Sequence, residues 1–113
     1  MAQDFEKAVG LNVGTSPATI LTSDSDDAII GIRLANILGS TIQVDAYITH
    51  NDGGGDDNYY LVKGINIPPN SSVELVDAGS ITIVMQSGDD LVIVSDTASS
   101  CDVWVSYIDT ISA

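Results

Sequence analysis

Apolar and polar residues alternate along several short segments of the chain, with the period of a β-strand. The clearest segment is residues 41–49, and the residues that share its apolar face are Ile42, Val44, Ala46 and Ile48. This alternation is typical of an antiparallel sheet with one buried face and one face in water. A helix over these residues would turn Asp45 toward the core, so we predict a strand.

Two further segments show the same alternation. In residues 28–36 it predicts that Ile30, Ile32 and Leu34 point into the core and that Ile29 lies on the outer face.

In residues 101–110 the positions Val103, Val105 and Tyr107 share one face, and Trp104 lies on the other. The remaining predicted strands are residues 11–13, 18–22, 59–65, 72–76, 81–86 and 91–95.

A corner at Pro68-Pro69-Asn70 divides the middle of the chain. Proline has no N–H to donate and fixes φ near −65°, so the chain leaves the sheet at Ile67 and re-enters after Asn70. We expect residues 59–76 to form a central hairpin around this corner.

The strand pattern predicts the fold class. Short strands separated by turns of Gly, Asp, Asn and Ser at intervals of roughly 8–12 residues favour an all-β fold. We expect an antiparallel β-sandwich or jelly roll of about eight short strands. Residues 1–10 have no clear period and form either an N-terminal arm or a first edge strand, and residues 11–113 form a single domain.

The charge of the chain excludes several classes of partner. Sixteen acidic and three basic residues give a formal net charge of −13, which repels phosphate backbones and anionic lipid. We therefore expect neither nucleic-acid nor membrane binding. The acidic surface serves either solubility alone or docking on a basic partner surface. No apolar run is long enough to span a bilayer, and no secretion signal is visible.

Residues that could carry chemistry are few. Cys101 is the only cysteine and is predicted to be a buried structural thiol, which fits synthesis in a reducing cytosol. His50 is the only histidine, and no nucleophile motif accompanies it, so we predict that it caps the end of a strand. We expect no enzyme and no cofactor.

Three acidic loops could offer carboxylate oxygens to a metal ion, and their residues are Asp24, Asp26 and Asp27; Asp52, Asp56 and Asp57; Asp89 and Asp90. None has the spacing of a calcium-binding loop. We interpret them as solvated turns and predict no metal site.

Large aromatic residues are the candidates for an interface, and they are Phe5, Tyr47, Tyr59, Tyr60 and Trp104. Adjacent residues of a strand face opposite sides, so we expect one of Tyr59 and Tyr60 in the core and the other exposed. Trp104 faces a neighbouring subunit or solvent, unless the N-terminal arm covers it.

Four stretches carry a family resemblance: residues 59–63, 67–72, 87–90 and 102–107. In this order, over roughly residues 30–112, the chain resembles small virion structural proteins of tailed bacteriophages, especially those that infect cyanobacteria. It differs from them at Pro68-Pro69, where a single proline is more usual.

The resemblance implies a structural protein of the virion, assembled in the host cytoplasm. It favours a capsid cement or decoration protein that bridges coat subunits on the shell exterior. Its partners would be the major capsid protein or other virion proteins and further copies of itself, as a trimer. The alternatives are a neck, baseplate or tail-fibre-associated module and a module that binds a host glycan.

Overall fold

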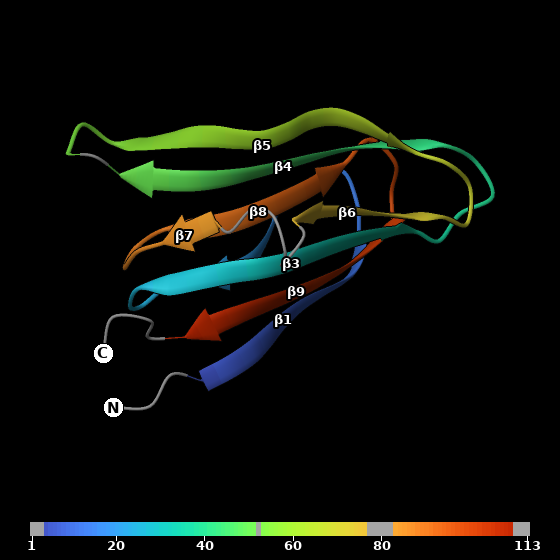
Figure 1. Ribbon diagram of the computed structural model, residues 1–113. Helices are drawn as coiled ribbons and strands as arrows, with labels where there is room; N and C mark the ends of the chain where they lie inside the picture. The colour runs from blue at the N-terminus through green and yellow to red at the C-terminus, as the bar shows by residue number, and fades with distance from the viewer. Residues whose placement is uncertain (1–3, 52, 77–82, 110–113) are drawn as a thin grey trace.

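The computed structural model describes residues 4–51, 53–76 and 83–109 of the chain. Within these ranges nine strands form two antiparallel sheets that pack face to face (Figure 1). The strands are β1 (Asp4–Val13), β2 (Ala18–Thr22), β3 (Asp27–Asn36), β4 (Ile42–Asn51), β5 (Asp56–Ile67), β6 (Ser72–Val76), β7 (Ile83–Met85), β8 (Asp90–Ser95) and β9 (Cys101–Asp109). The predicted all-β sandwich is confirmed, with nine strands instead of about eight. The described residues contain no helix long and apolar enough to cross a membrane.

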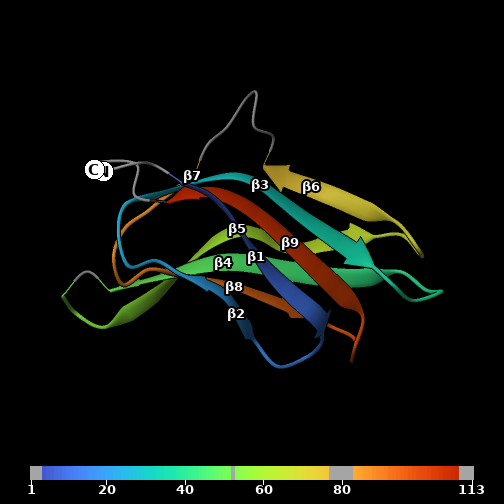
Figure 2. The ribbon, with the colours of Figure 1, turned by 90° about the horizontal axis from the view of Figure 1, so that it is seen from below.

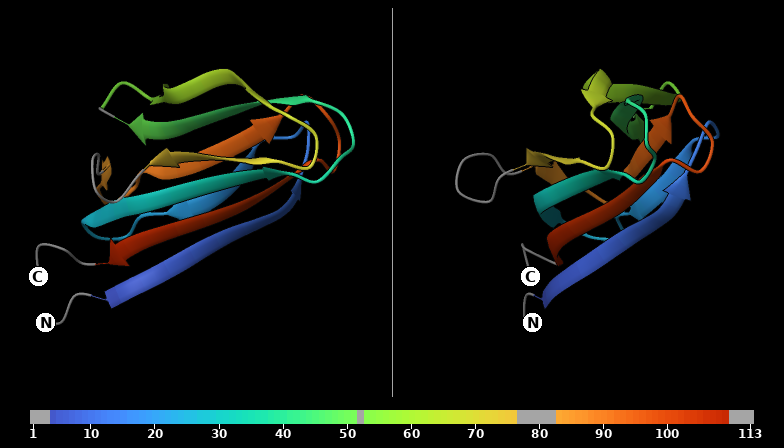
Figure 3. Two further views of the ribbon diagram at one scale, coloured as in Figure 1. Left: turned by 45° about the vertical axis from the view of Figure 1, so that its right-hand side comes forward. Right: turned by 90° about the vertical axis from the view of Figure 1, so that its right-hand side faces the viewer.

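The strand order within the sheets is that of a jelly roll. Sheet A has the order β1-β9-β3-β6, with β7 also pairing with β3, and sheet B has the order β2-β8-β4-β5. Figure 2 shows β1, β9, β3 and β6 side by side, and Figure 3 shows the two layers from further directions. If β6 and β7 are counted as one interrupted strand, successive strands alternate between the sheets as in a jelly roll, apart from the β4–β5 hairpin.

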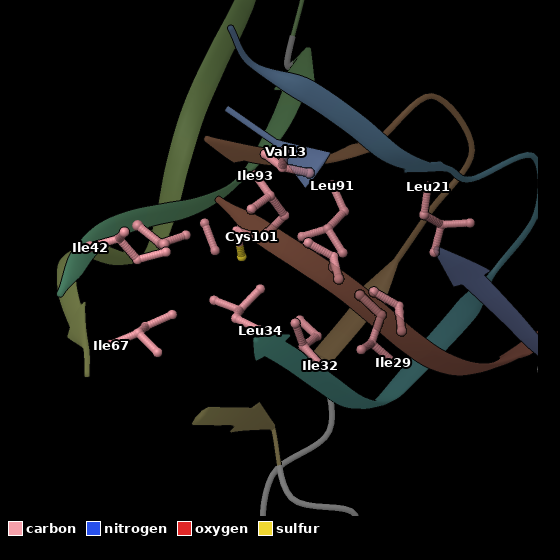
Figure 4. Close-up of a cluster of buried hydrophobic side chains, with 14 of the residues drawn as sticks. Val13, Leu21, Ile29, Ile32, Leu34, Ile42, Ile67, Leu91, Ile93 and Cys101 are labelled. Atoms are coloured by element: carbon pink, nitrogen blue, oxygen red, sulfur yellow. The ribbon is translucent and has the colours of Figure 1, made fainter. Parts of the chain in front are cut away.

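One apolar core lies between the sheets (Figure 4). Sheet A contributes Ile32 and Leu34, and sheet B contributes Ile42, Leu91 and Ile93, all of them completely buried. The alternation predicted for residues 41–49 is confirmed, because the side chains at positions 42, 44 and 46 are inside.

A β-bulge in β3 overturns one predicted orientation. Ile29 was expected on the outer face, but it is completely buried, whereas Ile30 is partly exposed. The register between β3 and β9 shifts between Ile29 and Gly31. An extra residue at a bulge reverses the faces of the residues on one side of it, so simple alternation fails there.

The corner at residues 68–70 is not a hairpin turn, so that expectation was wrong. β5 belongs to sheet B and β6 to sheet A, so the chain crosses from one layer to the other. Buried Asn36 holds this crossing, because its Nδ2 donates to the carbonyl oxygens of Ile67 at 3.0 Å and Pro68 at 3.1 Å. Asn70 takes a positive φ of 54°, which asparagine tolerates better than most residues.

The N-terminal segment is an edge strand and not a separate arm. β1 pairs with β9 from Asp4 opposite Asp109 to Gly10 opposite Val103, and the strand extends to Val13 with a register shift after Gly10. The inner side of this strand has little room: a Cβ on Gly10 would lie 2.6 Å from Cδ1 of Ile20. Ala8 and Gly10 therefore face inward on this part of β1, and Phe5, Val9 and Leu11 are left exposed.

Cys101 is completely buried, as predicted. Its burial raises the pKa of the thiol from 9.0 to about 11, which keeps it protonated and unreactive at neutral pH.

Candidate functional site

The outer face of sheet A carries most of the exposed large hydrophobic side chains of the described residues. Five of the eight lie there, and we call them the apolar face: Phe5, Val9, Leu11, Val84 and Trp104. Phe5 and Leu11 are each 77% exposed, and Trp104 is 52% exposed. Exposed apolar side chains gathered on one face of a small domain are typical of a binding surface.

Strand register brings these residues together. On β9 the side chains of Val103 and Val105 point into the core, so Trp104 points outward between them. Val9 of β1 and Arg33 of β3 lie directly opposite Trp104 on its two sides. Sequence positions almost a hundred residues apart thus form one row across the sheet.

A shallow groove crosses the apolar face beside this row. Its floor is formed where Ser106 lies opposite Gly31, two residues too small to fill the surface. Two hollows of about 360 and 420 Å³ meet there, since Ile30 and Ser106 line both. Trp104 borders the first hollow and Phe5 the second.

The apolar face is also where positive charge gathers. Lys7 and Arg33, two of the three basic residues of the chain, line these hollows. Nη2 of Arg33 lies 2.7 Å from Oε1 of Glu74, whereas Lys7 has no ion pair within the described ranges. Two of the three basic residues thus lie on this face of a chain whose net charge is −13.

The structure separates the aromatic residues that the sequence suggested for an interface. Phe5 and Trp104 lie on the apolar face, whereas Tyr47 and Tyr60 lie opposite each other on sheet B. The expectation that Tyr59 or Tyr60 is a core residue was wrong, because they are 50% and 45% exposed.

The outer face of sheet B covers its own apolar residues. Tyr47 is only 8% exposed, because the ring of Tyr60 lies 5.0 Å from it between centroids. Nζ of Lys63 lies 4.5 Å from the Tyr60 ring centroid and 3.9 Å from a carboxylate oxygen of Asp45. These cross-strand contacts leave little apolar surface for a partner beyond the exposed edge of Tyr60.

Three carboxylates meet at the end of the sandwich where β3 begins and β9 ends. Carboxylate oxygens of Asp24, Asp27 and Asp109 all lie within 4.8 Å of one another. Oγ of Ser25 lies 3.1 Å from Oδ1 of Asp27 and 3.0 Å from Oδ1 of Asp109, so the two carboxylates share its single hydrogen, and Oγ of Ser23 donates to Asp27 at 2.7 Å. Carboxylates are the ligands that hard cations prefer, but here serine hydroxyls already hold two of the three.

These charges also act on Tyr107. The pKa of its phenol is raised, first by partial burial and then by the negative charges of Glu6, Asp109, Asp27 and Asp24. No local sequence pattern indicates that Asp109 lies beside residues 24–27, because strand pairing alone brings them together.

His50 links two turns. Its Nδ1 lies 2.6 Å from Oδ1 of Asp89, and the other carboxylate oxygen of Asp89 accepts the backbone N–H of Gln86 at 2.9 Å. This pair ties the end of β4 to the turn between β7 and β8, in agreement with a strand-end position for His50.

Sequence reasoning missed Val9, Leu11 and Val84 as members of the apolar face, and it missed Lys7 and Arg33 beside them. A signal was present in residues 5–11, where large residues alternate with Glu6, Ala8 and Gly10. It was not recognised because the large residues of this strand point outward, opposite to the usual orientation.

Comparison with known proteins adds no relative: neither a model of a protein family nor a curated protein matches the chain.

Proposed function

We propose that this chain is a structural protein of a bacteriophage virion, a capsid cement or decoration protein that binds coat subunits on the shell exterior. The observation that carries the proposal is the apolar face of sheet A, whose Trp104 is half exposed beside Arg33. Tryptophan and arginine are the side chains most enriched at the energetic centres of protein interfaces. The resemblance of residues 30–112 to phage virion proteins supplies the class of partner.

The physical chemistry of the apolar face favours a protein partner. Burying its exposed side chains would stabilise a complex by about 25 cal/mol per Å² of apolar surface removed from water, before the costs of association. The shallow groove at Gly31 and Ser106 would accept a side chain of the partner. Jelly rolls are also a fold that capsid proteins use, although a fold by itself does not define a function.

The charge of the rest of the surface favours an external position. A chain of net charge −13 would be repelled by packaged nucleic acid inside the shell. Several weak contacts of one small domain, or of a homo-oligomer, would add up as avidity on a repetitive shell. The proposed role is binding alone, with no catalysis, no cofactor and no contact with nucleic acid or membrane.

Glycan binding is less well supported. A glycan site would need aromatic side chains grouped over polar groups, but Trp104 lies on sheet A and Tyr47 and Tyr60 lie on sheet B. A protein of the neck, baseplate or tail fibre would use the same docking face. The reconstruction described next distinguishes that location from the shell.

The test is a cryo-electron reconstruction of the particle with this chain assigned. Density on the shell exterior, with the apolar face against coat protein, is the expected result. Density at the tail alone would refute the cement role, and absence from the particle would refute the virion role.

A matched pair of variants tests the docking face itself. Particles stripped of this protein are incubated with purified wild-type chain, Trp104→Ser or Tyr60→Ser, and the bound fraction is measured. We expect Trp104→Ser to lose binding at least tenfold, whereas Tyr60→Ser on the opposite sheet binds like wild type. The reverse order would assign docking to sheet B.

A further inference from the structure

Strand β1 has a free edge. It is the first strand of sheet A and pairs only with β9 within the described ranges (Figure 1). Along its other side, backbone N–H and C=O groups have no neighbouring strand, and such an edge is a template for pairing with another chain.

Among the described residues, β1 provides the longest regular edge. Its register with β9 is continuous from Asp4 to Gly10. β5 is longer, but two register shifts and Gly64 with φ of 69° interrupt it. The other described edge strands are shorter: β2 and β6 have five residues each, and β7 has three. Irregular or short edges resist pairing, so β1 is the edge that is open to it.

The outward side chains of β1 are exposed in the single chain. Phe5, Val9 and Leu11 are 77%, 54% and 77% exposed, and all three lie on the outer side of the strand. No described element covers them. Lys7, the remaining outward residue, is the only charge in this row.

We propose that β1 pairs antiparallel with β1 of a second copy, around a two-fold axis at Ala8. The two copies of sheet A then form one continuous sheet, and their apolar faces lie on the same side. Phe5 lies opposite the partner's Leu11, and Lys7 lies opposite the partner's Val9. This self-association goes beyond the proposed docking on coat protein, and it gives a dimer instead of the trimer that the resemblance implies.

Several registers would place the outward side chains of one β1 strand opposite those of the other. Like-charge repulsion and the number of paired residues favour the one with its axis at Ala8. An axis at Lys7 would set two lysines directly opposite each other, and an axis at Glu6 would set two glutamates opposite each other. Like charges in such positions are destabilising. An axis at Val9 would pair only residues 7–11, because Asn12 has a positive φ of 53° and ends the regular strand. The axis at Ala8 pairs residues 5–11 without either penalty.

Net charge makes the dimer sensitive to salt. Two copies of charge −13 repel each other, and salt screens this repulsion. A contact between two such strands belongs to the small class of interfaces, below about 1,200 Å² in total, so a concentration-dependent equilibrium is expected. Raising the salt concentration should therefore favour the dimer.

Sedimentation equilibrium of the purified chain tests the association. We expect the apparent mass to rise from 11.8 kDa toward twice that value with concentration, at lower concentration in high salt. A chain that stays monomeric at high protein and salt concentrations, or that forms trimers, would overturn the proposal.

A charge-swap pair tests the register. Phe5→Glu and Leu11→Lys should each weaken the dimer about tenfold, because each substitution occurs twice in the interface. The double variant should recover wild-type association within about threefold, because each new carboxylate then faces a new ammonium across the axis. Its net charge equals that of the wild type, so recovery cannot come from overall charge.

Val84→Lys is the matched control. It makes the same charge change as Leu11→Lys on the same apolar face, but on β7 and away from β1. It should leave the dimer unchanged. A double variant no better than either single variant, with all variants folded by circular dichroism, would rule out this register.

Discussion

The outer faces of the two sheets differ in how far an outward-pointing aromatic side chain is exposed to solvent. Tyr47 on sheet B and Trp104 on sheet A are both outward aromatic residues in alternating strands. Tyr47 is 8% exposed because Tyr60 lies across it, whereas Trp104 is 52% exposed with Arg33 and Val9 beside it. The outer face of sheet B is covered by its own side chains, whereas the outer face of sheet A leaves Trp104 exposed.

This difference separates side chains that stabilise the fold from side chains that the proposed docking would use. A side chain covered by its neighbours contributes to folding, and one left open costs little to remove but is available to a partner. Four measurements can break or sharpen this contrast.

The largest effect is expected at Tyr47. Tyr47→Ala should lower the free energy of unfolding by about 3 kcal/mol, because it removes a buried ring and the support of Tyr60. Urea unfolding of the wild type and the variant measures this loss. Tyr60→Ala, at a half-exposed position, is the control and should cost clearly less. Equal losses of unfolding free energy in the two variants would mean that Tyr60 stabilises the fold as much as Tyr47 does.

The buried thiol of Cys101, in the core between the two sheets, makes a pH-dependent contribution to stability. The pKa of Cys101 is raised by burial from 9.0 to about 11, so the unfolded chain loses this proton at lower pH than the folded chain. The contribution of the Cys101 thiol to the free energy of unfolding is fully present below about pH 9. It falls by roughly 2 kcal/mol as the pH rises toward 11.

Unfolding free energies of the wild type and Cys101→Ala at pH 8 and pH 10.5 isolate this contribution. The difference between the two proteins should narrow at the higher pH. Tyr107, whose pKa is also raised, titrates in the same direction in both proteins and cancels. A difference independent of pH would contradict the burial of the thiol.

A small effect on folding is expected at Trp104. Trp104→Ser should lower the free energy of unfolding by less than about 1 kcal/mol, because half of the side chain is already in water. The same urea measurement checks it. A loss as large as that of Tyr47→Ala would mean that Trp104 serves the fold, and the contrast between the faces would fail.

The smallest effect on stability is expected from a comparison of Lys63 with Lys7. Lys63→Met should lower the free energy of unfolding by about 0.5 kcal/mol, because it removes the exposed contacts with Tyr60 and Asp45. Lys7→Met on the apolar face, which breaks no ion pair within the described ranges, is the matched control and should leave stability unchanged. Thermal or urea unfolding at low salt resolves the pair, and an equal loss in both would remove the distinction.

Much of the architecture was readable from the sequence. Period-2 alternation identified the inner residues of β4 and β9, and the turn residues gave most strand boundaries, with β2 predicted to the residue. The sequence also identified Phe5 and Trp104 as exposed aromatic candidates. These are local properties, because a strand faces solvent or core every second residue wherever it lies in the sheet.

Other features depend on contacts between distant segments. The bulge that buries Ile29, the crossing of the chain between layers after Ile67 and the meeting of Asp24 with Asp109 arise from strand pairing. No local pattern encodes which strand a segment will join.

The sequence by itself determined that Tyr47 and Trp104 point away from the core, and the tertiary structure decided which of them is covered. The physical reason is that alternation fixes a direction, whereas exposure depends on the side chains that strand register sets alongside. Tyr60 lies opposite Tyr47, but the row next to Trp104 holds Gly31 and Ser106, which are too small to cover it.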